Sequence, residues 1–337
     1  MTFKLAALAA AAWLAPLSAP AMSSANPVHT DHHVHVHSPG IRAFLPAYCN
    51  SPGRIGACDP AFVAPLTADD LLGDMDAAGV HGAYVMSTAY LAESPMMAPP
   101  LRDSTALVHE ANAFTVGLAK AHPGRLAAFV GVNPLTPTAL AEIAYWKDDP
   151  FAVGLKLHLT NSGVDLRDPD QAAQLAAVFD AASNAGMIIM IHMRTRAPDY
   201  GARDVRIFVD QVLPHAEGVP VIIAHSGGWG GLDANTWDAL EGFRQVLVEQ
   251  PALKTDLYFD LAQVFDADTS PSDLARLVEA MRSIGVDRFV PGSDWPFSGP
   301  LDSYLNGVMS RLPLTAAEAD SLRRRRVEES SRSGVGP

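Results

Sequence analysis

The chain is poor in basic residues and has no basic run before Arg323, close to its end. It carries 24 lysines and arginines against 37 aspartates and glutamates, a formal net charge of −13 with neutral histidine. Binding to a nucleic acid needs a cationic face, because the backbone phosphates must be neutralised. The composition therefore argues against nucleic acid as a partner and favours a small-molecule substrate.

Long apolar runs are also missing, apart from one near the start. Lys4 precedes the apolar residues 5–14, and small residues such as Ala19 and Ala21 follow, which is typical of a secretory signal peptide. That run is too short to cross a bilayer and no later run reaches about 18 apolar residues, so we expect no membrane anchor. We predict that residues 1–25 are a cleaved signal peptide and that the protein is periplasmic or secreted.

Cysteine is nearly absent. Cys49 and Cys58 are the only two, and both lie in one segment rich in proline and glycine. A framework of several disulfides is therefore excluded. In an exported protein the pair can close one disulfide, worth about 2 to 3 kcal/mol for so short a loop, and two free buried thiols are the alternative.

The rest of the chain is typical of one folded domain, with 48% hydrophobic and 18% charged residues. Residues 38–66, rich in proline and glycine, are predicted to be a long irregular loop that forms a lid or wall. Beyond them helices and strands alternate, starting with a helix that has Thr67 as N-cap and Gly79 as its C-terminal glycine. Counted from the histidine-rich segment near residue 30, further strands are predicted at 81–86, 126–132, 152–158, 187–192, 220–225, 256–262 and 288–292.

Eight strands separated by helices predict a (β/α)8 TIM barrel. An open doubly wound sheet is the alternative, but no G-x-G-x-x-G motif follows a strand, which removes the usual reason for a Rossmann fold. We place the barrel at residues 26–314 and an atypical C-terminal tail at residues 315–337. In such a barrel the chemistry lies at the carboxyl ends of the strands.

Five of the twelve histidines lie in the nine-residue segment 29–37, which contains the first predicted strand. Side chains two apart on a strand share a face, so His33 and His35 can bind one cation, and neutral imidazole is a common zinc ligand. His35 and His37 are equally well spaced, but Asp31 before His33 and Pro39 after His35 favour the first pair. A solvated tract that collects metal without using it is the alternative.

Several later strands also end in one strongly polar residue followed by a turn. His192 ends the fifth strand, His225 ends the sixth, and Asp294 follows the eighth, while Lys156 and His158 share a face of the fourth. A lone histidine after an apolar run is usually a hydrogen-bonded structural residue. Five polar residues at the same end of one barrel instead predict a functional site.

Together these residues resemble the amidohydrolase superfamily, specifically the amidohydrolase-2, or amidohydrolase-related, branch of metal-dependent barrel hydrolases. The resemblance spans residues 31–312, and it implies a divalent transition metal, first of all one Zn²⁺, held by His33, His35, His192 and Asp294 with His225 beside it. The branch also includes decarboxylases, hydratases and lactonases, and some members work without a metal. The family's last helix usually carries an Asn-Ala pair, whereas this chain has four arginines at 323–326. The matching motifs are Asp31-x-His33-x-His35, Gly154-x-Lys156-x-His158, His192, Ala224-His225-x-Gly227-Gly228 and Gly292-Ser293-Asp294-Trp295-Pro296.

We therefore expect metal-assisted hydrolysis of an amide, lactone or ester in a small substrate that bears a carboxylate. A zinc-like ion lowers the pKa of its bound water to about 7. Asp294 would take the proton from that water, and His225 would polarise the carbonyl or hold the oxyanion. Arg194 and Arg196, with their planar guanidinium groups, would bind the substrate carboxylate together with His158, and the alternative is that both are surface arginines on a loop.

Other functions remain open at this point. The same site could serve a lyase that releases carbon dioxide, and an exported protein could bind metal or a small acid without turnover, although binding alone needs no general base. Lys156 beside a dication also needs an explanation. It could stay cationic and pair with Asp294 or a substrate carboxylate, become carboxylated and bridge a second metal that His225 helps to hold, or turn outward. We favour the cationic role. A homo-oligomer is compatible with the sequence.

Overall fold

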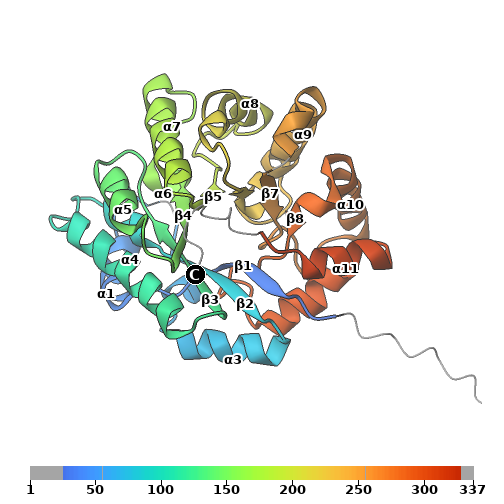
Figure 1. Ribbon diagram of the computed structural model, residues 1–337, viewed down its shortest axis with the longest axis horizontal. Helices are drawn as coiled ribbons and strands as arrows, with labels where there is room; N and C mark the ends of the chain where they lie inside the picture. Colours follow the sequence, from blue (N-terminus) through green and yellow to red (C-terminus); the bar gives the residue numbers. More distant parts are fainter. Residues whose placement is uncertain (1–25, 55, 255, 328–337) are drawn as a thin grey trace, which may run out of the picture.

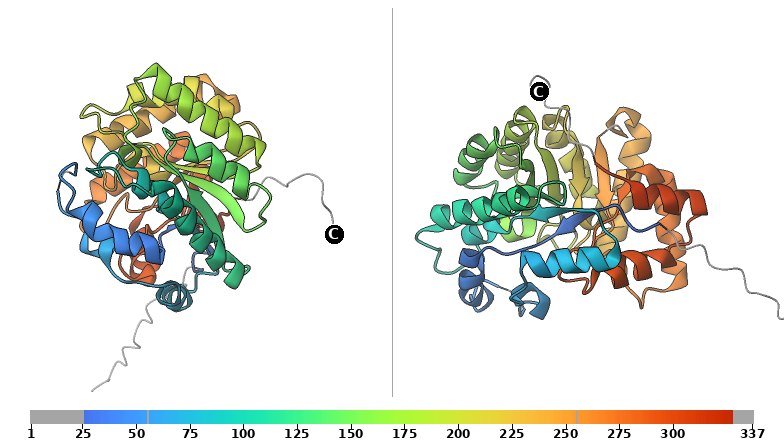
Figure 2. Two further views of the ribbon diagram at one scale, coloured as in Figure 1. Left: turned by 90° about the vertical axis from the view of Figure 1, so that its left-hand side faces the viewer. Right: turned by 60° about the horizontal axis from the view of Figure 1, so that its bottom comes forward.

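Eight parallel strands in sequential order form a barrel surrounded by helices (Figures 1 and 2). The computed structural model describes residues 26–54, 56–254 and 256–327. The sheet closes between its last and first strands, because the amide of Asp294 donates to the carbonyl of His33 (2.8 Å) and Val34 pairs with Trp295. The predicted (β/α)8 barrel is confirmed. The strands are β1 (Thr30–Val34), β2 (Gly82–Met86), β3 (Leu126–Gly131), β4 (Ala152–His158), β5 (Ile188–His192), β6 (Val221–Ile223), β7 (Leu257–Asp260) and β8 (Phe289–Val290).

The helices begin where the sequence supplies capping residues. Thr67 and Asp70 form a capping box at the start of α3, and Gly79 ends that helix in the left-handed region with φ 68°, as predicted. Side chains of Asp and Ser also cap the N-termini of several later helices by accepting hydrogen bonds from backbone amides of the first turn. The helices are α1 (Pro39–Cys49), α2 (Pro60–Val63), α3 (Ala68–Ala78), α4 (Ser104–Ala121), α5 (Thr138–Trp146), α6 (Leu159–Ser162), α7 (Pro169–Asn184), α8 (Ala202–Gln211), α9 (Ala234–Glu249), α10 (Pro271–Ile284) and α11 (Ala316–Arg324).

The segment 38–66 is not the irregular loop that its composition predicted. It contains α1 and α2, because Pro39 lies in the first turn of α1, where its missing N–H costs nothing, and the Ser38 hydroxyl accepts from the amide of Ile41 (3.1 Å). Cys49 and Cys58 form a disulfide. The predicted disulfide is therefore confirmed over the alternative of two free thiols.

The fold extends beyond residue 314, the predicted C-terminal boundary of the barrel. Helix α11 packs onto the barrel, and the side chain of Arg323 donates to the Asn26 carbonyl (3.3 Å) and to Oδ1 of Asn306 (3.0 Å). Only the first part of the predicted tail is described, and it belongs to the fold. The predicted signal peptide, residues 1–25, lies outside the described residues.

Two hydrophobic layers support the barrel. The outer layer lies between strands and helices, and the inner one fills the barrel with side chains such as Phe129 and Met190. Gly154 faces this interior, where a Cβ atom would come within 2.3 Å of the Phe129 ring, so a larger residue does not fit. Among the described residues, no helix has both the length and the apolarity needed to span a bilayer.

Candidate metal centre and substrate cavity

An extra residue in β1 sets the orientation of the histidine cluster. Asp31 pairs with Ala83 but Val34 pairs with Val85, so β1 has one more residue than β2 between these pairs. Such a bulge redirects side chains. Consecutive residues, His32 and His33, consequently both contact side chains inside the barrel, which simple alternation does not predict.

His33, His35 and Asp294 converge at the carboxyl end of the barrel. Nε2 of His33 and Nε2 of His35 are 3.2 Å apart, and Oδ1 of Asp294 lies 3.4 Å and 3.1 Å from them. The Nδ1–H of His35 donates to the Met86 carbonyl (3.2 Å), and Lys156 donates to Nε2 of His33 (2.8 Å). Because these partners leave the proton of each neutral ring on Nδ1, both Nε2 lone pairs point toward the same small region as the Asp294 carboxylate.

Burial keeps these histidines neutral. It lowers the pKa of His33 well below its usual value, with further lowering by the Lys156 ammonium, and it lowers the pKa of His35 despite the nearby Asp294 carboxylate. Burial opposes ionisation of Asp294, but the adjacent His35 and His225 hold its pKa below the ordinary value. The centre thus presents imidazole lone pairs and an ionised carboxylate, which is the donor set that zinc prefers.

His192 lies near this group without belonging to it in this geometry. Its ring stacks on His158 (3.9 Å between centroids) and lies 5.0 Å from His225, and its buried Nδ1 has no hydrogen-bond partner among the described residues. An unpartnered buried nitrogen is costly, so this atom fits a ligand or substrate contact. Three of the four predicted ligands are together, and His192 is their neighbour.

His225 lies in the turn η3 (Ala224–Gly227) that follows β6. Its backbone is left-handed, with φ 52°, and its Nδ1–H donates to the Ala262 carbonyl (2.7 Å). Burial lowers the pKa of His225 and favours the neutral ring. Neutral His225 therefore offers Nε2 as an acceptor, and the predicted oxyanion role, which stays a prediction, would require His225 to take up a proton first.

Lys156 is buried inside the barrel, so the outward, structural alternative is excluded. Its Nζ lies 2.8 Å from Nε2 of His33 and 3.5 Å from Sδ of Met190. Burial lowers the pKa of Lys156, while the carboxylates of Asp260 and Asp294 oppose that shift. The contact uses the lone pair of His33 that a metal ion would need, so this ammonium competes with metal at that atom.

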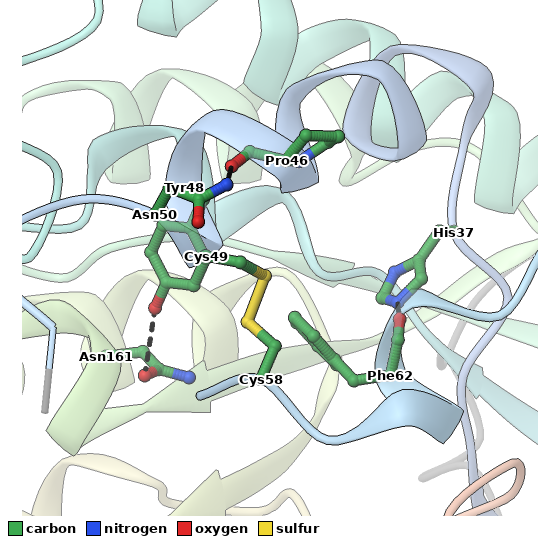
Figure 3. Close-up of a disulfide and its surroundings, with 8 residues drawn as sticks. All are labelled: His37, Pro46, Tyr48, Cys49, Asn50, Cys58, Phe62 and Asn161. Atoms are coloured by element: carbon green, nitrogen blue, oxygen red, sulfur yellow. Dashed lines mark hydrogen bonds between the residues drawn. A yellow bond between two sulfur atoms is a disulfide. The ribbon is translucent and has the colours of Figure 1, made fainter. Parts of the chain in front are cut away.

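Two residues near the centre answer questions that the sequence left open. His37 has both ring nitrogens engaged elsewhere, with Thr88 Oγ1 (2.8 Å) and the Phe62 carbonyl (2.9 Å), which supports the pair His33 and His35 (Figure 3).

Asp260, which ends β7, was missed by sequence reasoning although it also follows an apolar strand. Its Oδ2 lies 2.9 Å from Nδ1 of His33.

A cavity of about 670 Å³ lies over these residues, and the disulfide segment forms part of its wall. In Figure 3 the disulfide of Cys49 and Cys58 is flanked by the side chains of Tyr48 and Phe62. The Tyr48 hydroxyl donates to Oδ1 of Asn161 (3.3 Å). Facing the same space are the aromatic side chains Tyr90, Trp229, Phe265 and Phe297, the predicted substrate contact His158, and Arg54.

The structure does not place Arg194 or Arg196 in this cavity lining. Arg194 pairs with Asp233 (2.9 Å) and lies over the ring of Tyr200, and Arg196 is exposed. The arginine that does line the cavity is Arg54. That guanidinium lies 4.8 Å from the centroid of the Tyr48 ring, and its buried Nε has no partner among the described residues.

A family model described as Amidohydrolase matches residues 30–329. The chain belongs to the amidohydrolase family. It is accordingly a metal-dependent enzyme, a hydrolase or a lyase, as the motifs predicted. Comparison with curated proteins finds no match.

Solved structures of other amidohydrolase-type barrels share this fold. The 5-carboxyvanillate decarboxylase of Sphingomonas paucimobilis has a TM-score of 0.62 at 15% identity, covering 88% of this chain and 97% of its own. An amidohydrolase from Burkholderia multivorans with bound zinc scores 0.56 at 18% identity, covering 88% and 95%. A 5-carboxyvanillate decarboxylase from Novosphingobium aromaticivorans, complexed with manganese and 4-hydroxy-3-methoxy-5-nitrobenzoic acid, scores 0.57 at 13% identity, covering 89% and 94%. At these identities the likeness is one of fold.

Proposed function

We propose that this amidohydrolase binds one divalent transition metal, with zinc as the first candidate, and hydrolyses an amide, lactone or ester in a small, ring-shaped carboxylic acid. The observation that carries the proposal is the convergence of Nε2 of His33, Nε2 of His35 and Oδ1 of Asp294. Two zinc-bound nitrogens at tetrahedral angles would be about 3.3 Å apart, close to the separation of these imidazoles. A bound ion of this kind supplies Lewis acidity and a water molecule that ionises near neutral pH.

The protein side chains supply the proton transfers and the orientation. Asp294, held ionised, accepts the proton of the attacking water, and that proton is then delivered to the leaving group, either directly or through Nε2 of His225. His192 supplies the fourth predicted ligand through a ring with a free nitrogen. Two metals bridged by a carboxylated Lys156 remain the alternative stoichiometry.

The cavity wall supports a planar acid as substrate. Aromatic rings on several loops suit a flat ring. Arg54 is positioned for a carboxylate because its Nε has no partner in the described part of the chain and Tyr48 supports its guanidinium. Replacing Arg54 with Lys keeps the charge but loses the planar fork. We expect kcat/KM on an acidic substrate to fall by about tenfold or more, against little change for the matched control Arg194→Lys.

Decarboxylation of the same acid is the second candidate. It is supported by the decarboxylases among the solved structures of similar fold. The residues described here can serve either reaction, since a lyase would also need a held carboxylate and a proton carrier.

One assay separates the two reactions. The purified protein is analysed for metal and then incubated, metal-loaded, with lactones, amides and esters of ring carboxylic acids and with the free acids. Incorporation of ¹⁸O from labelled water identifies the hydrolase, and release of carbon dioxide identifies the lyase. Failure to bind about one equivalent of a transition metal at His33, His35 and Asp294 would refute the proposed centre.

Export is proposed on the sequence alone. The expected chain isolated from the periplasm or medium begins between Met22 and Asn26. Cytosolic protein that retains Met1 would contradict export without affecting the proposed reaction.

A further inference from the structure

Asp260 is the most completely engaged buried carboxylate near the metal centre. It ends β7 with no exposed surface. Its Oδ2 meets Nδ1 of His33 (2.9 Å), and its Oδ1 accepts from the amides of His225 (2.7 Å) and Ala262 (3.1 Å). Its backbone carbonyl accepts from the hydroxyl of Ser226 (2.7 Å).

The first contact determines which nitrogen of His33 carries the proton. With Asp260 at Nδ1 and the Lys156 ammonium donating to Nε2, the proton of the neutral ring lies on Nδ1. Nε2 then keeps its lone pair and faces His35 and Asp294. A carboxylate behind a histidine in this way also fixes the orientation of the ring.

The other contacts hold the turn that carries His225. His225 and Ser226 both have left-handed backbones, with φ 52° and 51°, a conformation that residues other than glycine rarely adopt. One oxygen of Asp260 binds the amide of His225 and its carbonyl binds the Ser226 side chain. The same residue therefore controls a candidate metal ligand and the neighbouring acid-base candidate.

We propose that Asp260 is a positioning residue that fixes the tautomer of His33 and the turn of His225. The first part rests on the proposed function, because it matters only if Nε2 of His33 binds metal. Asp260 itself contacts the ring of His33 and the backbone of His225 and is not among the residues that line the cavity.

The decisive variant is Asp260→Asn. If Oδ1 of the asparagine keeps the amides of His225 and Ala262, its NH₂ group faces Nδ1 of His33 and donates to it. The ring proton then moves to Nε2, where it blocks the metal. We expect metal affinity, measured by competition with a chelator, to fall by about 10- to 100-fold.

Asp31→Asn is the matched control. Asp31 is equally buried, and its Oδ1 accepts from the backbone amides of His33 (3.1 Å) and Ser293 (3.0 Å) without touching the His33 ring. The asparagine can keep that acceptor oxygen. We expect the tautomer of His33 to be unchanged in this variant.

The tautomer is read directly from ¹⁵N shifts and long-range couplings of labelled histidine in the metal-free protein. Wild type should show His33 protonated at Nδ1, and Asp260→Asn should show it protonated at Nε2. A wild-type His33 protonated at Nε2 would overturn the proposal even if Asp260→Asn failed to fold. So would an Asp260→Asn protein with the wild-type tautomer and metal affinity.

Ser226→Ala tests the second part. It removes one tether of the turn and leaves the His33 ring untouched, so we expect metal affinity within twofold of wild type and a several-fold lower kcat. An unchanged kcat would refute the link to His225. A wild type that binds no metal but shows the expected tautomer would instead refute the proposed function and leave the role of Asp260 intact.

Discussion

The two ends of the barrel use the same residue type for different purposes. At the carboxyl end, imidazole lone pairs of His33 and His35 face one another and an ionised carboxylate. At the amino end, His32 has both nitrogens satisfied: Nδ1–H donates to the Pro291 carbonyl (2.9 Å), and Nε2 accepts from the amide of Val327 (3.3 Å).

The amino end is closed by the last described residues of the chain. Val327 enters the apolar cluster inside the barrel, and its carbonyl accepts from the hydroxyl of Tyr84. The carboxyl end has the larger of the two cavities, about 670 Å³ against about 500 Å³ beside Val327, and the residues Asp294 and His225 there have left-handed backbones. At the amino end His32 thus has both nitrogens bonded within the protein, whereas at the carboxyl end imidazole lone pairs face a cavity.

The largest effect should come from the carboxyl end. Asp294→Ala removes a candidate ligand and the general base, so we expect turnover to fall by roughly a hundredfold or more, with loss of bound metal. Because alanine tolerates the left-handed backbone of this position, φ 62°, no better than aspartate does, stability is measured by denaturant titration beside turnover and metal content. His37→Ala, which alters a histidine outside the centre, should retain metal. Full activity in Asp294→Ala would contradict the site.

The amino end should respond in the opposite way. A chain that ends at Arg324 loses the burial of Val327 and the hydrogen bonds that Val327 makes with His32 and Tyr84. We expect a loss of about 3 to 5 kcal/mol in unfolding free energy, measured by denaturant titration, with metal affinity retained in the folded fraction. A chain that ends at Val327 is the control. Equal stability of the two chains would show that the closing segment contributes nothing.

Acid should weaken the amino end through His32. Burial, aided by the nearby charges of Arg326 and His29, lowers its pKa from 6.5 to about 4. The unfolded chain then binds the extra proton, so this contribution is complete above about pH 6.5 and is lost as the pH falls toward 4, up to about 3 kcal/mol. In the presence of chelator, His32→Gln should show a shallower decline of stability over this range. An identical slope would refute the assignment.

The smallest effect is expected at the disulfide, which borders the cavity but not the metal centre. The double variant Cys49→Ser, Cys58→Ser should lose about 2 to 3 kcal/mol of stability. Because the loop carries Arg54, KM for an acidic substrate should rise several-fold while kcat changes little. A change in kcat with an unchanged KM would place the segment in the chemistry and not in substrate binding.

Local sequence patterns were sufficient for the barrel, and together with the family resemblance they indicated most of the candidate metal centre. Alternating strands and helices, capping residues and polar strand ends are local signals, and parallel strands bring their carboxyl ends together whatever the details of packing. His33, His35, His225 and Asp294 were found in this way. Export and oligomeric state stay predictions.

Contacts between distant residues were decided by the tertiary structure. His33 and Asp260 are 227 positions apart and His32 and Val327 are 295 apart, so no local periodicity could pair them. The bulge in β1 depends on its register with β2, and the choice of Arg54 over Arg194 depends on which guanidinium already has a carboxylate partner. The sequence by itself determined which residue types lie at the ends of the strands. The tautomers of the histidines, their hydrogen-bond partners and the lone pairs left for a ligand were decided only by the tertiary structure, because they depend on which groups packing places beside each polar atom.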